Sequence, residues 1–162
     1  METIPFLTKE DVVTLDGLLT DFLQKSEATL TVVIERGGTV IAQQGEIKSI
    51  DITTIAALAA GSFAATKELA KRVGETEFTA LYHQGKEQHI FMNALDEHTM
   101  MITVFGERTT VGLVRFYTAN MATNLARFLH NLRHREVGLS QPPLDPDISL
   151  SPSSITSGKI FV

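Results

Sequence analysis

One alanine-rich stretch, residues 52–73, restricts what this chain can fold into more than any other part of the sequence. It reads ITTIAALAAGSFAATKELAKRV, and alanine, leucine, lysine and glutamate all favour a helix. Asp51 precedes the stretch as a candidate N-cap. Lys71 and Arg72 occupy its last turn, and Gly74 follows at the usual stop position. We therefore predict one helix, about 33 Å long at ~1.5 Å per residue, with one face packed against the rest of the domain.

The two faces of this predicted helix differ in side-chain size. On a helical wheel the large apolar residues gather on one side, which we expect to face the core: Ile55, Leu58, Leu69 and Val73, with Ile52 and Phe63 at the margin. The other side carries small residues and then charged ones: Ala56, Ala57, Ala60, Gly61 and Ala64, followed by Lys67, Glu68 and Lys71. A glycine inside a helix costs about 1 kcal/mol relative to alanine, so Gly61 contradicts a purely propensity-driven helix. It favours a docking surface over the alternative, an alanine-rich helix selected for propensity.

Composition narrows the possible class of protein. A chain of 162 residues predicts one domain with its own core. Cysteine is absent, which excludes disulfides, thiolate metal sites and cysteine nucleophiles. The net charge of −5 argues against nucleic acid or an anionic membrane surface as a partner. Since no apolar run is long enough to span a bilayer, we expect a cytoplasmic protein.

Apolar periodicity and turn residues predict the remaining elements of an α+β domain at residues 8–135. Helices are expected at 8–25 and from Thr109 or Thr110 to about His134, and strands at 30–35, 39–44, 78–84, 88–95 and 98–105. The first helix should bury Val12, Leu15, Leu18, Leu19, Phe22 and Leu23. Short connections such as Gly37-Gly38 indicate antiparallel pairing. Residues 136–162 are rich in proline and serine, which predicts a tail, and its apolar end at 159–162 could dock as an extended peptide.

No group of residues has the composition and spacing of a catalytic site. His130 and His134 have the spacing of half a zinc site, but no glutamate base lies between them, so an exposed helix end is the simpler interpretation. His83 and His89 flank a hairpin and could lie near each other across it.

Nucleotide chemistry finds no support in the sequence either. The phosphate-binding pattern G-x-x-x-x-G-K-[ST] does not occur. Arg36 and Arg108 are expected in loops from which they could reach a partner, although a lone loop arginine is usually just solvated. We therefore expect no catalytic residue, cofactor or metal in this chain.

Several segments together carry a resemblance to a known family. They read LLTDFLQK, LTVVIERGGTVIAQQG and IAALAAGSFAATKELAKRVGE, followed by the strand meander and a helix that begins VGLVRFY. Over about residues 8–135 this pattern resembles the roadblock (dynein light chain) family, and within it the branch of MglB-type bacterial regulators. The resemblance implies a five-stranded antiparallel sheet, with the first and last helices on one face and the long middle helix on the other.

The resemblance also implies a function. Family members pair through their third strands and middle helices, and in this branch the homodimer docks a small Ras-like, MglA-type GTPase on the paired helices. It stimulates GTP hydrolysis in cell polarity or gliding motility by reshaping the GTPase's own switch loops. The implied contacts are Ala57 and Gly61, with Ala60, Ala64 and Lys67 as neighbours. Two alternatives stay open: a non-catalytic interaction scaffold, and a small-ligand sensor with a pocket lined by strands within residues 78–105.

Overall fold

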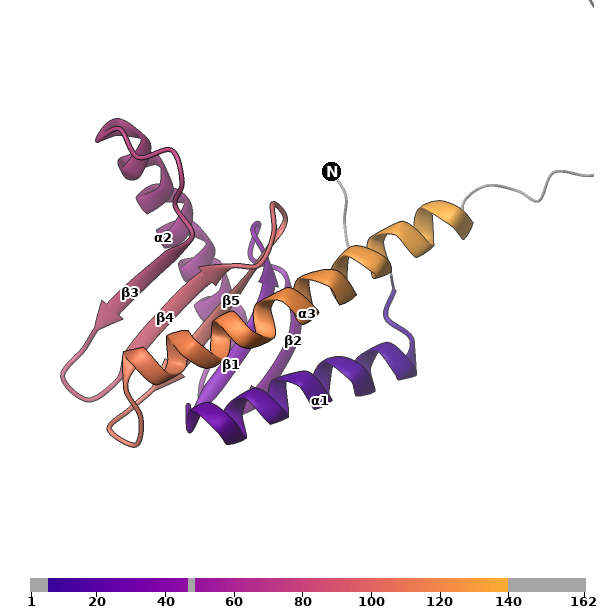
Figure 1. The fold of residues 1–162 in the computed structure, drawn as a ribbon, viewed down its shortest axis with the longest axis horizontal. Coiled ribbons are helices and arrows are strands. Elements are labelled where there is room, and N and C mark those ends of the chain that lie inside the picture. Colours follow the sequence, from indigo (N-terminus) through magenta and orange to yellow (C-terminus); the bar gives the residue numbers. More distant parts are fainter. Residues whose placement is uncertain (1–5, 47–48, 140–162) are drawn as a thin grey trace, which may run out of the picture.

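The computed structural model describes residues 6–46 and 49–139 and confirms the predicted order of elements (Figure 1). The helices are α1 (Lys9–Ser26), α2 (Ile52–Arg72) and α3 (Val111–Leu139). The strands are β1 (Leu30–Glu35), β2 (Val40–Gly45), β3 (Ala80–Gln84), β4 (His89–Ala94) and β5 (Thr99–Phe105). Residues 136–139 of the predicted tail at 136–162 form the end of α3, which corrects the start of that tail. The rest of it, 140–162, and residues 47–48 of the connector before α2 lie outside the described residues.

The strands form one antiparallel sheet in the order β2-β1-β5-β4-β3. β1 and β5 lie at its centre, which explains why both are apolar on both faces and almost completely buried. β2 and β3 form the two edges. α1 packs beside β2, whereas β3 pairs only with β4 within the described part of the chain.

Helices cover both faces of the sheet, as predicted (Figure 1). α1 and α3 pack on one face around Leu19, Leu125 and Phe105. α2 packs on the other face, where Phe63 lies over a cluster that includes Met100 and Ile102. The protein is therefore a three-layer α+β domain.

Local sequence signals place most element ends correctly. Thr8 and Asp11 form a complete capping box at the start of α1, the Asp51 carboxylate accepts from the Thr54 N–H, and the Thr110 hydroxyl accepts from the Leu113 N–H. α3 runs to Leu139 and not to about His134 as predicted, because residues 135–139 contain no proline and the single Gly138 is not enough to end the helix.

One residue of the predicted α1 stripe is misplaced. Val12 is exposed, and the neighbouring Asp11 is buried in its place. The cause is an ion pair: Asp11 accepts two hydrogen bonds from the Arg135 guanidinium, at 2.7 and 3.2 Å. This pair fixes the C-terminal half of α3 against the start of α1.

The buried face of α2 differs from the prediction. Leu58, Leu69 and Val73 were expected in the core but are 68%, 62% and 76% exposed. The helix instead buries a narrower set made mostly of small residues: Ile52, Ala56, Ala59, Ala60 and Phe63. α2 is thus rotated by roughly a quarter turn from the predicted orientation, because alanines let its backbone approach the sheet while Phe63 fills the remaining space.

Asp96, in the turn between β4 and β5, connects elements on both sides of the sheet. One carboxylate oxygen accepts hydrogen bonds from the backbone N–H groups of His98 and Thr99 and from the Thr99 hydroxyl. The other accepts from the buried Arg133 of α3 at 2.8 Å. The Asp96 backbone carbonyl accepts from Arg36 in the turn between β1 and β2 at 2.7 Å. Burial alone would raise the pKa of Asp96, but the hydrogen bonds from Arg133, His98 and Thr99 together lower it below its usual value.

Asp96→Asn should lower the free energy of unfolding by about 2–3 kcal/mol at pH 7, because it leaves the buried Arg133 without its counter-ion. The folded-state pKa lies below the unfolded one. The charge contribution is therefore fully present above about pH 4 and is lost as the pH falls through the folded-state pKa. Urea unfolding at pH 7 and at pH 3 should show the difference between wild type and variant shrinking in acid. The matched control Glu97→Gln changes an exposed neighbour and should be neutral. Equal stability of Asp96→Asn and wild type at pH 7 would contradict the role assigned to Asp96.

Candidate functional site

The outer face of α2 is the candidate site, and its exposure follows from how the helix is seated. Because Ala56, Ala59 and Ala60 face the sheet, the residues about half a turn away face outward. The turn between β1 and β2 borders this face. At Gly38, whose φ is +102°, a β-carbon would lie 3.3 Å from the Ala57 Cα. A glycine therefore fits this position both in conformation and in space.

The structure divides the predicted contact residues into two groups. Ala57, Gly61 and Ala64 are exposed on the outer face, and we call these three residues the docking strip. Lys67 is half-buried at the end of the strip. Ala60, expected on the same surface, is only 7% exposed and packs toward the sheet, so that expectation of exposure is wrong. Ala56 is fully buried as well.

No neighbouring group fills the space above Gly61. A β-carbon built there meets no atom within 4 Å apart from the helix's own backbone. The glycine is thus not required by packing within the described part of the chain. Its cost in helix propensity is unexplained by the fold of one copy, which is consistent with a surface kept flat for a second protein.

A second exposed surface on α2 was not predicted. Leu58 lines an apolar groove of about 240 Å³ between α2 and the strands β3 and β4. The exposed Leu69 lies about three turns further along on the same side of the helix. Ile55, Ser62, His83 and Ile90 are among the residues that line this groove. These large apolar residues were predicted to lie in the core, and for that reason an exposed apolar surface was not expected here.

The edge of the sheet next to this groove is open. Among the described residues nothing pairs with the outer side of β3, and its last residues, His83 and Gln84, are exposed. An open edge strand beside exposed leucines is a surface on which a second chain can add both backbone hydrogen bonds and apolar contact.

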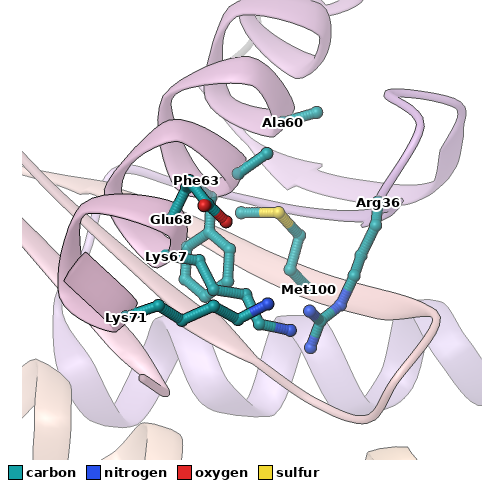
Figure 2. A pocket seen from close by; sticks show the side chains of 8 residues that line it. Arg36, Ala60, Phe63, Lys67, Glu68, Lys71 and Met100 are labelled. Atoms are coloured by element: carbon teal, nitrogen blue, oxygen red, sulfur yellow. The ribbon is translucent and has the colours of Figure 1, made fainter. Parts of the chain in front are cut away.

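A cationic pocket of about 250 Å³ lies at the C-terminal end of the docking strip (Figure 2). Arg36 from the turn between β1 and β2 and Lys67 and Lys71 from α2 line it, with Phe63 and Met100 behind them. Figure 2 shows the nitrogen atoms of the three cationic side chains pointing toward one another, and the Glu68 carboxylate lying apart from them. The sequence analysis treated Arg36 as an isolated loop residue and missed this convergence, which depends on how the hairpin meets α2.

The histidines form no centre that could hold a metal. Among the described residues no group of three or more histidine, aspartate or glutamate side chains could hold a metal ion. The rings of His130 and His134 contact each other, with centroids 3.9 Å apart and planes inclined by 35°, on an exposed part of α3. His83 and His89 do not meet across their hairpin. His83 lines the groove beside α2, while His89 Nδ1 lies 3.3 Å from the Tyr82 hydroxyl in contact with Phe105 on the other face.

Comparison with known proteins identifies the domain. A sequence profile of the Roadblock/LC7 domain matches residues 14–105. The chain belongs to the Roadblock/LC7 family. A comparison with curated protein sequences gives no match.

Solved structures of MglB proteins resemble this Roadblock/LC7 chain over most of its length. Myxococcus xanthus MglB is 26% identical with a TM-score of 0.69, over 73% of this chain and 96% of that one. The gliding protein MglB of Thermus thermophilus is 28% identical with a TM-score of 0.70, over 80% and 97%. An MglB described as having a tetrameric arrangement is 28% identical with a TM-score of 0.73, again over 80% and 97%. The fold and family point to a regulatory or scaffold role.

Within residues 6–46 and 49–139, no helix is both long enough and apolar enough to cross a lipid bilayer.

Two neighbouring alanines give a direct test of how α2 is seated. Ala56→Leu should lower the free energy of unfolding by about 1–3 kcal/mol, because the added atoms enter a filled core. Ala57→Leu, the same change one residue along on the exposed face, should stay within about 0.5 kcal/mol of wild type. Gly61→Ala should raise the free energy of unfolding by about 0.5–1 kcal/mol, because alanine favours a helix more than glycine does. Urea denaturation at one fixed protein concentration measures all three. Equal effects at positions 56 and 57 would show that the orientation of α2 is wrong.

Proposed function

We propose that this chain is a homodimeric regulator that docks a small Ras-like GTPase on its paired α2 helices and stimulates GTP hydrolysis in the cytoplasm, in the service of cell polarity or gliding motility. The observation that carries the proposal is the exposed docking strip on α2, in a chain similar to MglB proteins along most of its length. Small side chains let a second backbone come close over a wide area.

A dimer would use the surfaces that one copy leaves open. Two β3 edges can pair to continue the sheet, and the exposed Leu58 and Leu69 of each α2 can then pack against the other copy. This arrangement buries the apolar flanks. It leaves Ala57, Gly61 and Ala64 of both helices on a common outer surface. The two α2 helices of the dimer would then form one continuous surface, called here the platform, on which a partner can bind.

In the proposed mechanism this chain selects one conformation of the GTPase, and none of its own residues takes part in the chemical step. The sequence offers no nucleotide-binding motif. A partner can shift a GTPase toward a hydrolysis-competent arrangement only if it binds that arrangement more tightly than the other. Aligning the attacking water within that arrangement then accelerates hydrolysis. Arg36 already donates a hydrogen bond to the Asp96 carbonyl, so it suits a fixed contact better than an inserted arginine finger.

The alternative functions make different predictions. A non-catalytic scaffold would bind the GTPase without changing its rate, which single-turnover GTP hydrolysis distinguishes directly. A small-ligand sensor would use the groove between α2 and the strands β3 and β4. A thermal-shift screen would then give stabilising small molecules in the absence of any protein partner.

The double variant Ala57→Arg/Gly61→Arg should weaken binding of the GTPase at least about 100-fold, because two long charged side chains hold the surfaces apart. Stimulation of GTP hydrolysis should be lost in parallel. Both positions are exposed, so the far-UV circular dichroism spectrum should match wild type. The melting temperature should be at least that of wild type, because arginine favours a helix more than Gly61 does. If the variant stimulates hydrolysis normally, the docking assignment is wrong.

Leu58→Glu/Leu69→Glu should shift the chain from dimer to monomer, with a dissociation constant raised by about 100-fold or more, because the dimer would bury unpaired carboxylates. Sedimentation velocity across a concentration series measures this. The control Leu113→Glu changes a leucine that is exposed on α3, outside the proposed interface, and should leave the dimer intact. Dimers of unchanged affinity in the double variant would exclude the α2 flank as the interface.

A further inference from the structure

The cationic pocket at the end of the docking strip has an excess of positive charge that the fold does not balance. In the described part of the chain none of Arg36, Lys67 and Lys71 forms an ion pair. Two of the acids near the pocket are paired with other cations. Glu68 pairs with Arg72 at 3.3 Å, and the Asp96 carboxylate pairs with Arg133 at 2.8 Å. In a chain of net charge −5, an unpaired cluster of this kind is unexpected.

The pocket is also held in place before any ligand arrives. Arg36 is fixed by its hydrogen bond to the Asp96 carbonyl at 2.7 Å, and its guanidinium carbon lies 5.7 Å from the centre of the Phe63 ring. Its Nε is buried and has no hydrogen-bond partner. Lys67 is half-buried, so its stem is restrained. Because Arg36 is fixed and the Lys67 stem is restrained, these two cations lose less conformational entropy on binding an anion than the exposed Lys71 does.

We propose that this pocket receives a carboxylate side chain of the GTPase that docks on α2. The inference rests on the proposed function and adds to it a specific electrostatic contact. The position of the pocket identifies its occupant, because the pocket adjoins the docking strip. Ala64 of the strip and Lys67 at its end also line the pocket. Any protein lying along the docking strip therefore covers the mouth of the pocket.

The surroundings favour a single carboxylate over a polyanion. Glu68 lines the same pocket, and Glu97 lines the adjoining hollow on the other side of Arg36 and Lys67. Together with the overall negative charge, these acids would repel a nucleic acid or a polyphosphate chain. One aspartate or glutamate side chain carries a charge that the three cations can neutralise, and guanidinium and ammonium groups both donate charge-assisted hydrogen bonds to it.

The test is the affinity of the full-length chain for the purified Ras-like GTPase of its own cell, measured by calorimetry at two salt concentrations. Lys67→Met/Lys71→Met removes two charges but keeps the length and apolar character of both stems. It should weaken binding about 10-fold or more at low salt, as expected for a close interfacial charge pair. The loss should diminish at high salt. The matched control Lys9→Met/Lys86→Met removes the same charge at exposed positions on α1 and in the turn between β3 and β4, and should bind like wild type.

Each result bears on the proposal. If Lys67→Met/Lys71→Met binds like the control while Ala57→Arg/Gly61→Arg fails to bind, the docking function stands and the carboxylate contact is overturned. If no such GTPase binds the wild-type chain, both are overturned. The side-chain NMR signals of Lys67 and Lys71 in the free chain should be unchanged by truncation after Leu139. A shift would place an acid of the chain's own tail, such as Asp145 or Asp147, in the pocket and would overturn the assignment.

Discussion

The close packing of α2 on the sheet is the constraint on which the rest of the structure depends. Alanines at positions 56, 59 and 60 allow the helix backbone to lie near β1 and β5, and Ile52 and Phe63 supply the bulk on that face. A narrow contact of this kind buries only part of the helix circumference. Both flanks are thereby left outside: one with Leu58 and Leu69, the other with the docking strip. Larger residues on the sheet-facing side would lift the helix and separate both flanks from the elements that border them.

A second set of contacts fixes the two exposed flanks of α2 relative to α1 and α3 on the other face of the sheet. Asp96 joins Arg133 of α3 to the turn between β4 and β5, and its carbonyl holds Arg36 beside α2. The surface of α2 and the helix on the far side of the sheet are thus linked through one turn. The Asp11–Arg135 pair fixes the same part of α3 to α1. The C-terminal half of α3 is therefore part of the framework that positions Arg36.

The sequence predicted the elements well and the orientation of α2 poorly, for physical reasons that are visible in particular residues. The turn at Gly37-Gly38 and the caps at Thr8 and Asp51 are local interactions, so their meaning can be derived from neighbouring residues. Which face of α2 packs inward depends on volumes in the sheet far away in sequence, and a helical wheel assigns the largest residues to the core by default. Leu58 and Leu69 depart from that default, because both are exposed on the proposed dimer surface, and such a surface has the composition of a core. The cationic pocket was beyond prediction, because Arg36 and Lys67 meet only through the tertiary fold.

Apolar contact and charge contribute differently to the proposed platform. Flat apolar contact provides affinity with little directional preference, whereas a charged pocket fixes register and orientation. A two-fold dimer carries two copies of every surface. A single GTPase lying across both α2 helices is itself asymmetric, and one carboxylate can enter only one of the two pockets. Occupying that pocket would fix the partner in one of two symmetry-equivalent positions, which the small residues of the docking strip cannot do. The cations at the end of the strip would therefore set where along α2 the partner binds, and the alanines and Gly61 how closely it approaches.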